Sequence, residues 1–216
     1  MILKILSSLL FLAISITHLV VAYKELENCR KITKLFIIFS LMLVLLSFKI
    51  NNLWLYFALI CSLIGDALLL IPSNKAFVVG ACSFSLTHCT YLGVIGSLLP
   101  SQFNWCYYGI LVLAGYLFVE LIKNRMKKYM GKLTIPSSLY MYLILAEWTS
   151  ALLLLIFVPS VWSVITFIGV TLFFVSDAIL ICSRFIKEFS RAHFYLMIFY
   201  ISAQGCLLLS LGFLTK

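Results

Sequence analysis

The sequence is poor in charge, and in acidic residues above all. Only 11% of its 216 residues are charged and 64% are hydrophobic, whereas a soluble globular domain has about 25% charged and about 45–50% apolar residues. This shortage excludes an ordinary soluble domain and predicts an integral membrane protein. The net charge of +9 does not indicate binding to nucleic acid, because no soluble basic domain is present to carry such a surface. On so apolar a chain, basic residues are typical topology signals and headgroup contacts.

Several motifs of familiar chemistry are also missing. The three histidines lie far apart and no H-x-x-x-H or C-x-x-C pair occurs, so no metal site is indicated. There is no G-x-S-x-G and no Walker motif. The seven cysteines fall mostly inside apolar runs without paired spacing. We expect them to be small buried hydrophobic residues and not disulfide partners.

Apolar runs long enough to cross about 30 Å of hydrocarbon occur eight times. The breaks between them are short charged or turn segments, which leave no room for a separate soluble domain. We therefore predict an all-α fold, a single integral-membrane domain over residues 1–216 that forms a polytopic bundle of eight transmembrane helices. The expected helices cover approximately residues 2–23, 35–50, 53–71, 77–98, 104–122, 136–158, 161–183 and 192–214.

Lysine and arginine are distributed unevenly between the two sides of this bundle. Of the 16, thirteen fall in the first, third, fifth and seventh loops, and only Lys4, Lys49 and Lys216 lie on the opposite side. Basic loops stay in the cytoplasm, so both termini are expected on the non-cytoplasmic side of a bacterial inner membrane or a eukaryotic endomembrane. Cleavage of the first helix as a signal peptide would export the basic segment KELENCRKITK, and we therefore expect that helix to be retained.

Two aspartates lie inside the predicted spans at similar depth. Asp66 is about five residues from the cytoplasmic end of its helix, or about 7–8 Å at the helical rise per residue, and Asp177 is about 10 Å from the same face. The segments IGDALLLI and VSDAILIC match around them and are 111 residues apart. This spacing suggests two parallel four-helix halves, in which the helices at 53–71 and 77–98 correspond to those at 161–183 and 192–214.

A carboxylate at membrane depth costs about 2.5–3.5 kcal/mol on insertion scales, so it faces the bundle interior and is a functional candidate. If Asp66 and Asp177 are buried together, one carboxyl should hold its proton near neutral pH while the other stays charged. An acid/base pair needs this division of labour. The alternative is a structural role, in which each aspartate accepts hydrogen bonds from neighbouring hydroxyls.

Four further polar residues lie deep in the predicted spans. His88 is near mid-membrane, and Glu147 is deep enough that it should be protonated or paired, with His88 as one candidate partner. Tyr200 and Gln204 are four residues apart on one helical face and would either line a pocket or bridge helices. Three other residues were expected near the cytoplasmic boundary and are not taken as site residues: His18, Glu120 and His193.

The order of these motifs resembles the YhhN-like lysoplasmalogenase family over nearly the whole chain. The resemblance is carried by Gly65, Asp66 and Leu69, by Phe84 and His88, by Ser176, Asp177 and Leu180, and by Tyr200 and Gln204. The basic turn RKITKLF also looks like the family's segment before its second helix, although Leu35 stands where a proline is expected.

The resemblance implies a membrane hydrolase that cleaves the vinyl ether bond of lysoplasmalogen to a fatty aldehyde and a glycerophospho-choline or glycerophospho-ethanolamine. Asp66 and Asp177 would then be catalytic, as acid and base in an order left open, and His88, Glu147, Tyr200 and Gln204 would bind substrate or water. No cofactor is required, since a vinyl ether is cleaved by acid. The partner is a lysophospholipid in the bilayer, whose phosphate the basic cytoplasmic loops would attract.

A second class of function fits the same residues. A proton-coupled transporter or lipid-binding membrane protein could use a buried Asp pair at a repeat interface to relay protons or bind a cation. Its typical sign, helices broken by Gly or Pro at corresponding places in two halves, is not seen here. A purely structural protein would have little reason to keep two matched buried carboxylates.

Overall fold

The computed structural model describes residues 1–187 and 189–216, which form helices and short connections without any β-strand. Asn52, Ser73, Asn104 and Ser160 cap the starts of four helices by accepting hydrogen bonds from backbone amides of the first turn, which satisfies donors that a helix start leaves unpaired. The helices are α1 (Ile2–Tyr23), α2 (Glu27–Ser47), α3 (Leu53–Leu69), α4 (Asn74–Ser97), α5 (Trp105–Met130), α6 (Thr134–Phe157), α7 (Val161–Ile181) and α8 (Ala192–Leu214), with a 3₁₀ turn η1 (Gly131–Leu133) and a π-helical turn η2 (Cys182–Ile186).

Five of these helices are long and apolar enough to cross a membrane: α1, α4, α6, α8, and α7 together with η2. Helix α3 is apolar but shorter. The all-helical fold predicted from the sequence is thus confirmed, with five candidate membrane spans. That all eight helices cross, and that they form two parallel halves, stay predictions.

Two predicted helix boundaries were wrong, and in both cases charged residues lie on the helix. Helix α2 was expected to begin at residue 35 but begins at Glu27, so Lys34 belongs to the helix and not to a loop. Helix α5 was expected to end near residue 122 but continues to Met130. Hydropathy reports where the apolar part of a helix ends, whereas lysine and arginine are good helix formers that let the helix continue.

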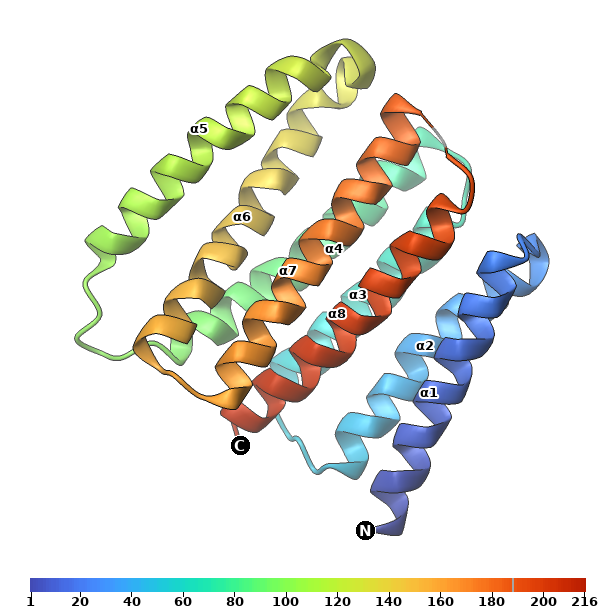
Figure 1. The fold of residues 1–216 in the computed structure, drawn as a ribbon, viewed down its shortest axis with the longest axis horizontal. Helices are drawn as coiled ribbons and strands as arrows, with labels where there is room; N and C mark the ends of the chain where they lie inside the picture. The colour runs from blue at the N-terminus through green and yellow to red at the C-terminus, as the bar shows by residue number, and fades with distance from the viewer. Residues whose placement is uncertain (188) are drawn as a thin grey trace.

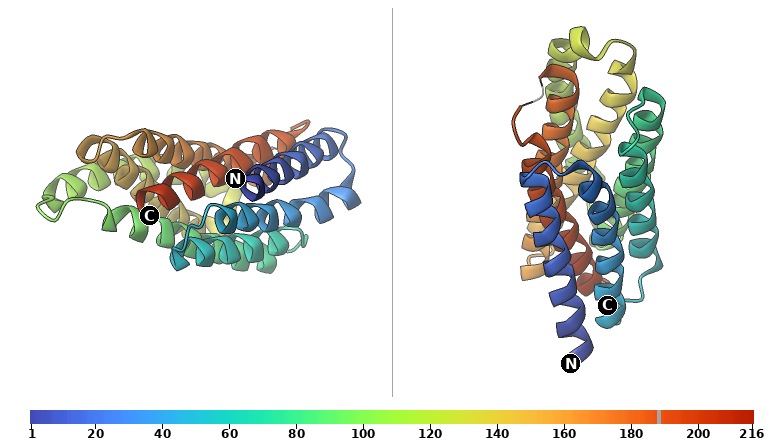
Figure 2. Two further views of the ribbon diagram at one scale, coloured as in Figure 1. Left: turned by 90° about the horizontal axis from the view of Figure 1, so that it is seen from below. Right: turned by 90° about the vertical axis from the view of Figure 1, so that its right-hand side faces the viewer.

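The helices run side by side in the order shown in Figure 1, with α1 and α2 at one edge and α5 and α6 at the other. Figure 2 shows α1, α8 and α7 in one row and α2, α3 and α4 in a second row. Helix α3 packs mainly on α4, and α7 mainly on α8. Both termini lie at the same end of the bundle (Figure 1).

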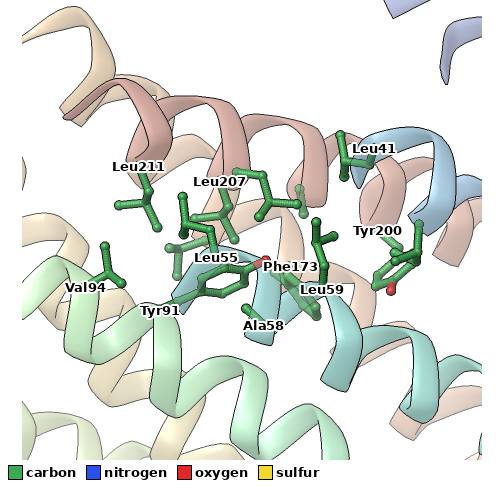
Figure 3. Close-up of a cluster of buried hydrophobic side chains, with 14 of the residues drawn as sticks. Leu41, Leu55, Ala58, Leu59, Tyr91, Val94, Phe173, Tyr200, Leu207 and Leu211 are labelled. Atoms are coloured by element: carbon green, nitrogen blue, oxygen red, sulfur yellow. The ribbon is translucent and has the colours of Figure 1, made fainter. Parts of the chain in front are cut away.

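The core lies between the two rows and is mostly apolar. Leu55, Leu59, Leu207 and Leu211 are fully buried there, and Figure 3 shows these side chains facing one another from α3 and α8. Many large apolar side chains on the outside of the bundle are exposed, as expected for helices that face lipid. Polar side chains inside this core therefore need partners within the protein.

Candidate functional site

Asp66 on α3 is buried and its two oxygens have separate partners. The ammonium of Lys34 on α2 lies 2.9 Å from Asp66 Oδ1, and the hydroxyl of Tyr200 on α8 donates to Asp66 Oδ2 at 2.7 Å. Only 1% of Asp66 and 5% of Lys34 is exposed. The aspartate is thus held as part of a buried ion pair that joins three helices.

This ion pair continues into a chain of hydrogen bonds. The amide of Gln204 donates to Ser62 Oγ at 3.0 Å and, more weakly, to the Tyr200 hydroxyl at 3.4 Å. Its oxygen accepts from the hydroxyl of Tyr91 on α4 at 2.8 Å. Tyr200 and Gln204 do share one face of α8, as predicted, and they bridge helices there.

Asp177 on α7 belongs to a second network. The hydroxyl of Tyr140 on α6 donates to Asp177 Oδ2 at 3.0 Å, and His88 Nε2 lies 3.1 Å from that hydroxyl and 3.7 Å from Asp177 Oδ2. On the other side of the ring, His88 Nδ1 is hydrogen-bonded to Glu147 Oε2. The contact between His88 and Glu147 that the sequence suggested is therefore present.

Two aromatic rings lie between the networks. The Phe173 ring packs edge-on against both His88, at 4.6 Å between centroids, and Tyr200, at 5.5 Å. The Phe84 ring contacts Phe173 and Tyr200 in the same manner. Gly65 makes room for this ring, because a Cβ added there would lie 2.6 Å from Phe84 Cε2. In the part of the chain that the structure describes, no hydrogen bond joins Asp66 to Asp177.

A cavity of about 510 Å³ connects the two networks. Its wall includes Asp177 and also Lys34 and Tyr200, the two partners of Asp66. Apolar residues such as Phe84 and Leu180 complete the inner wall, and basic residues lie at the end near the α2 start and η2. The two aspartates thus have different settings, because Asp177 faces the cavity directly and Asp66 lies behind Lys34 and Tyr200.

The sequence identified most of these residues but missed Lys34 and Tyr140. The sequence interpretation counted Lys34 among the loop charges that set topology. Lys34 follows Arg30 and Lys31 by three to four residues, which on a helix is one turn further along the same face. This spacing could have placed Lys34 deeper in the bundle than the two residues before it. Tyr140 was one of many aromatics that fit an interfacial position. Nothing in the local sequence of Tyr140 distinguishes it from those.

His18, which was expected near the cytoplasmic boundary and discounted as a site residue, lies in the last two turns of α1 and its side chain has partners inside the bundle. His18 is fully buried, with Nδ1 2.8 Å from Thr33 Oγ1 and its ring edge-on to His193 at 5.9 Å between centroids. Helices α2 and α8 cover α1 at this level. The His193 side chain is partly buried and lines the cavity. Glu120 lies apart from the cavity, bound to Lys123 and Tyr142.

No set of three His, Cys, Asp or Glu side chains within residues 1–187 and 189–216 is arranged to hold a metal ion. The polar groups that do gather in the two networks, three carboxylates with a lysine, a histidine and three tyrosines, are suited to moving protons. A carboxyl group with a tyrosine hydroxyl and an imidazole behind it can give up a proton and take one back.

The sequence of the chain is similar to known proteins of one family. The sequence profile of the YhhN family matches residues 29–211. The protein named "Uncharacterized membrane protein YhhN" in Escherichia coli O6:H1 and in Shigella flexneri is 28% identical over 134 residues, which is 61% of this chain and 61% of each relative. Mouse "Lysoplasmalogenase TMEM86B" is 30% identical over 155 residues, 71% of this chain and 61% of the relative. The chain thus matches about three fifths of the length of these relatives. No solved structure gives a significant match.

Proposed function

Because the chain belongs to the YhhN family, we propose that it is a membrane hydrolase that cleaves the vinyl ether bond of a lysoplasmalogen. The products would be a fatty aldehyde and a glycerophospho-choline or glycerophospho-ethanolamine. The mouse relative carries the name of this activity. The eight-helix bundle, with both termini on the non-cytoplasmic side, is part of the same proposal.

The observation that carries the proposal is the position of Asp177. Its carboxyl group faces the cavity and is hydrogen-bonded by Tyr140, with His88 and Glu147 behind. Asp66 forms an ion pair with Lys34 at 2.9 Å, and it is Lys34 and Tyr200, not Asp66 itself, that line the cavity. We therefore assign Asp177 as the acid that touches the substrate. Asp66 is a positioning residue, because it acts through Lys34 and Tyr200.

The proposed reaction needs only a proton and a water molecule. The Asp177 carboxyl gives its proton to the β-carbon of the vinyl ether, and the double bond becomes an oxocarbenium ion next to the new carboxylate. Water adds to the oxocarbenium carbon and returns a proton to Asp177, which leaves a hemiacetal. The hemiacetal C–O bond to the glycerol breaks, and the proton passes from the hemiacetal hydroxyl to the glycerol oxygen. One water molecule is consumed for each aldehyde released.

The negative charge of Asp177 stabilises the cation as it forms, and this is the type of interaction that lowers a reaction barrier most in a water-poor site. Tyr140 holds the carboxylate in place through a hydrogen bond, and His88 is hydrogen-bonded in turn to the Tyr140 hydroxyl. Tyr200 and Lys34 also line this cavity. They would orient the ether oxygen and the attacking water.

The experiment is aldehyde release from a lysoplasmalogen by the purified full chain in lipid nanodiscs. Wild type should release aldehyde, and Asp177→Asn should lower turnover by about a hundredfold or more, the usual contribution of a general acid. Glu120→Gln, which changes an acid outside the cavity, should keep wild-type turnover. A wild type that releases no aldehyde, or an Asp177→Asn variant with normal turnover, would contradict the proposal. Proton flux in proteoliposomes without aldehyde would favour the transporter alternative.

A further inference from the structure

Two cavities of opposite character meet at Asp177. One is the cavity already described, whose outer end is basic. The other, of about 200 Å³, lies between α5, α6 and α7 and is lined by apolar side chains such as Phe118, Met141 and Ile144 in addition to Asp177. The carboxyl group of Asp177 is thus reached from a polar side and from an apolar side.

The apolar cavity continues as a groove along the bundle. A third cavity, of about 480 Å³, shares Phe118, Leu145 and Phe174 with it. Together they extend along α5 from Ile122 to Leu111, along α6 from Met141 to Leu152, and from Cys182 at the start of η2 along α7 to Thr171. Each of these stretches is about 16 Å long at a rise of about 1.5 Å per residue.

The walls of this groove carry almost no polar groups. Thr149 and Thr171 are its hydroxyl-bearing residues, and the hydroxyl of Thr171 is already engaged, since it accepts a hydrogen bond from Trp148 Nε1 at 3.1 Å. Gly115 faces Leu145 there without a side chain of its own. A hydrocarbon chain is the ligand that suits a narrow groove of this composition, because it loses no hydrogen bonds on entering.

On the polar side, the cavity wall carries Arg30, Lys31 and Arg184, with Glu27 as the acid among them. Arg184 lies seven residues beyond Asp177 on the same helical segment, or about 10 Å away along its axis. Its guanidinium donates to Asn74 Oδ1 at 3.1 Å and lies 4.1 Å from the centre of the Phe77 ring. Arginine held in this way is suited to binding phosphate.

Arg30 Nε is a buried donor without a partner among the described residues, and His193 Nε2, which carries a hydrogen in one tautomer of the ring, has no partner there either. Both residues line the cavity. A buried donor without an acceptor is costly, and the phosphate oxygens of a ligand would supply acceptors. The unpartnered donors and the arginines therefore indicate the same ligand chemistry.

We propose that the groove between α5, α6 and α7 holds the hydrocarbon chain of a single-chain phospholipid, and that Arg30, Arg184 and His193 hold its phosphate. This inference rests on the proposed function and adds the residues that hold the two ends of the substrate and the direction in which it lies. The order of chain, cleavable bond and phosphate in a lysolipid then matches the order of groove, Asp177 and basic cavity.

The groove is tested by filling its far end. Leu152→Trp should lower kcat/KM for long alkenyl chains by about tenfold or more and leave short chains unaffected, and the retained short-chain turnover shows that the variant is folded. Leu139→Trp, on the same helix but exposed on its outer face, is the matched control and should leave the chain-length profile unchanged. An unaltered profile in Leu152→Trp would overturn the groove as the chain site.

The phosphate site is tested by comparing two substrates. Arg184→Gln should raise KM by about tenfold for a lysoplasmalogen, the effect of one charge-assisted hydrogen bond, but not for an alkenyl glycerol without phosphate. Lys187→Gln is the control, since Lys187 follows the end of η2 and does not line the cavity. Equal losses for both substrates would overturn the assignment.

Inorganic phosphate should compete with the lysolipid only at far higher concentration than the lysolipid itself. Equal affinity for the two would mean that the basic residues form a site for a free anion instead.

A binding measurement separates this inference from the reaction. A non-cleavable alkyl ether lysolipid with a brominated chain should quench the fluorescence of Trp148, which lines the groove, and the saturable part of the quenching should vanish in Trp148→Phe. If wild type releases no aldehyde but this quenching is found, the groove is supported as the chain-binding site and the proposed hydrolase activity is contradicted. If aldehyde is released without quenching at Trp148, the proposed hydrolase activity is supported and the groove is contradicted as the chain-binding site.

Discussion

At the scale of single residues, the same short motif places two aspartates in different chemical settings. Asp66 has a lysine and a tyrosine as partners and lies behind them. Asp177 has a tyrosine and a histidine and faces the cavity. The role of a carboxyl group therefore depends on the helices packed opposite, and a matching sequence around two aspartates does not make them equivalent.

The ion pair of Lys34 and Asp66 should behave as a unit in unfolding experiments. Lys34→Met or Asp66→Asn alone leaves a buried charge without its partner, which typically costs about 3–5 kcal/mol. The double variant removes both charges, so it should be less destabilised than the sum of the two single variants. Thermal unfolding of the purified protein in detergent measures this coupling. Additive losses would show that the two side chains do not interact.

Glu147 is predicted to act through His88, to which it is hydrogen-bonded. Glu147→Gln keeps the size of the side chain but removes the charge behind the imidazole, and loss of positioning of this kind can lower kcat by up to about a hundredfold. The pH profile of kcat should also shift, whereas a purely structural effect would scale the whole profile evenly. Glu120→Gln is the control, and an unshifted profile in Glu147→Gln would remove the residue from the proton network.

At the scale of helices, the sequence predicted most of the architecture from hydropathy alone. Each predicted apolar run overlaps a helix among the described residues, and the predicted bounds of α1 and α8 agree with the structure. The start of α2 could not be found in this way, because its first two turns carry Glu27, Arg30, Lys31 and Lys34 and have no apolar run. The partners across helices, such as Tyr140 with Asp177, depend on packing angles that no local pattern contains.

The close approach of α7 and α8 depends on Gly169. A Cβ at this position would lie 3.1 Å from the backbone nitrogen of Leu207 and 2.9 Å from Leu207 Cγ, and the backbone atom cannot move without shifting α8. Gly169→Ala should therefore lower the melting temperature and, since α8 carries Tyr200, also lower turnover. Gly93→Ala on α4 is the control, because a Cβ there meets nothing within 4 Å and alanine is the better helix former by about 1 kcal/mol. A Gly169→Ala variant as stable as Gly93→Ala would contradict this packing.

At the scale of the whole molecule, the two networks are related by nearly the same sequence offset. Asp66 and Asp177 are 111 residues apart, and their partners His88 and Tyr200 are 112 residues apart. Asp66 on α3 contacts Tyr200 on α8, and Asp177 on α7 approaches His88 on α4. Each aspartate thus finds its partner in the other proposed half. Crossed contacts of this kind support the prediction of two parallel four-helix halves, with the cavity between them.

The eight-span topology predicts that both termini lie on the non-cytoplasmic side of the membrane and that the connection between α1 and α2 lies in the cytoplasm. In variants with a single cysteine, a charged maleimide added outside sealed cells should label Ile2→Cys and Lys216→Cys, both expected on the non-cytoplasmic side. Cys29, which is exposed at the start of α2, should react only after the membrane is opened, because the basic residues around it keep it in the cytoplasm. Labelling of the two ends from opposite sides would mean an odd number of spans. The eight-span topology with both termini on the non-cytoplasmic side would then be wrong.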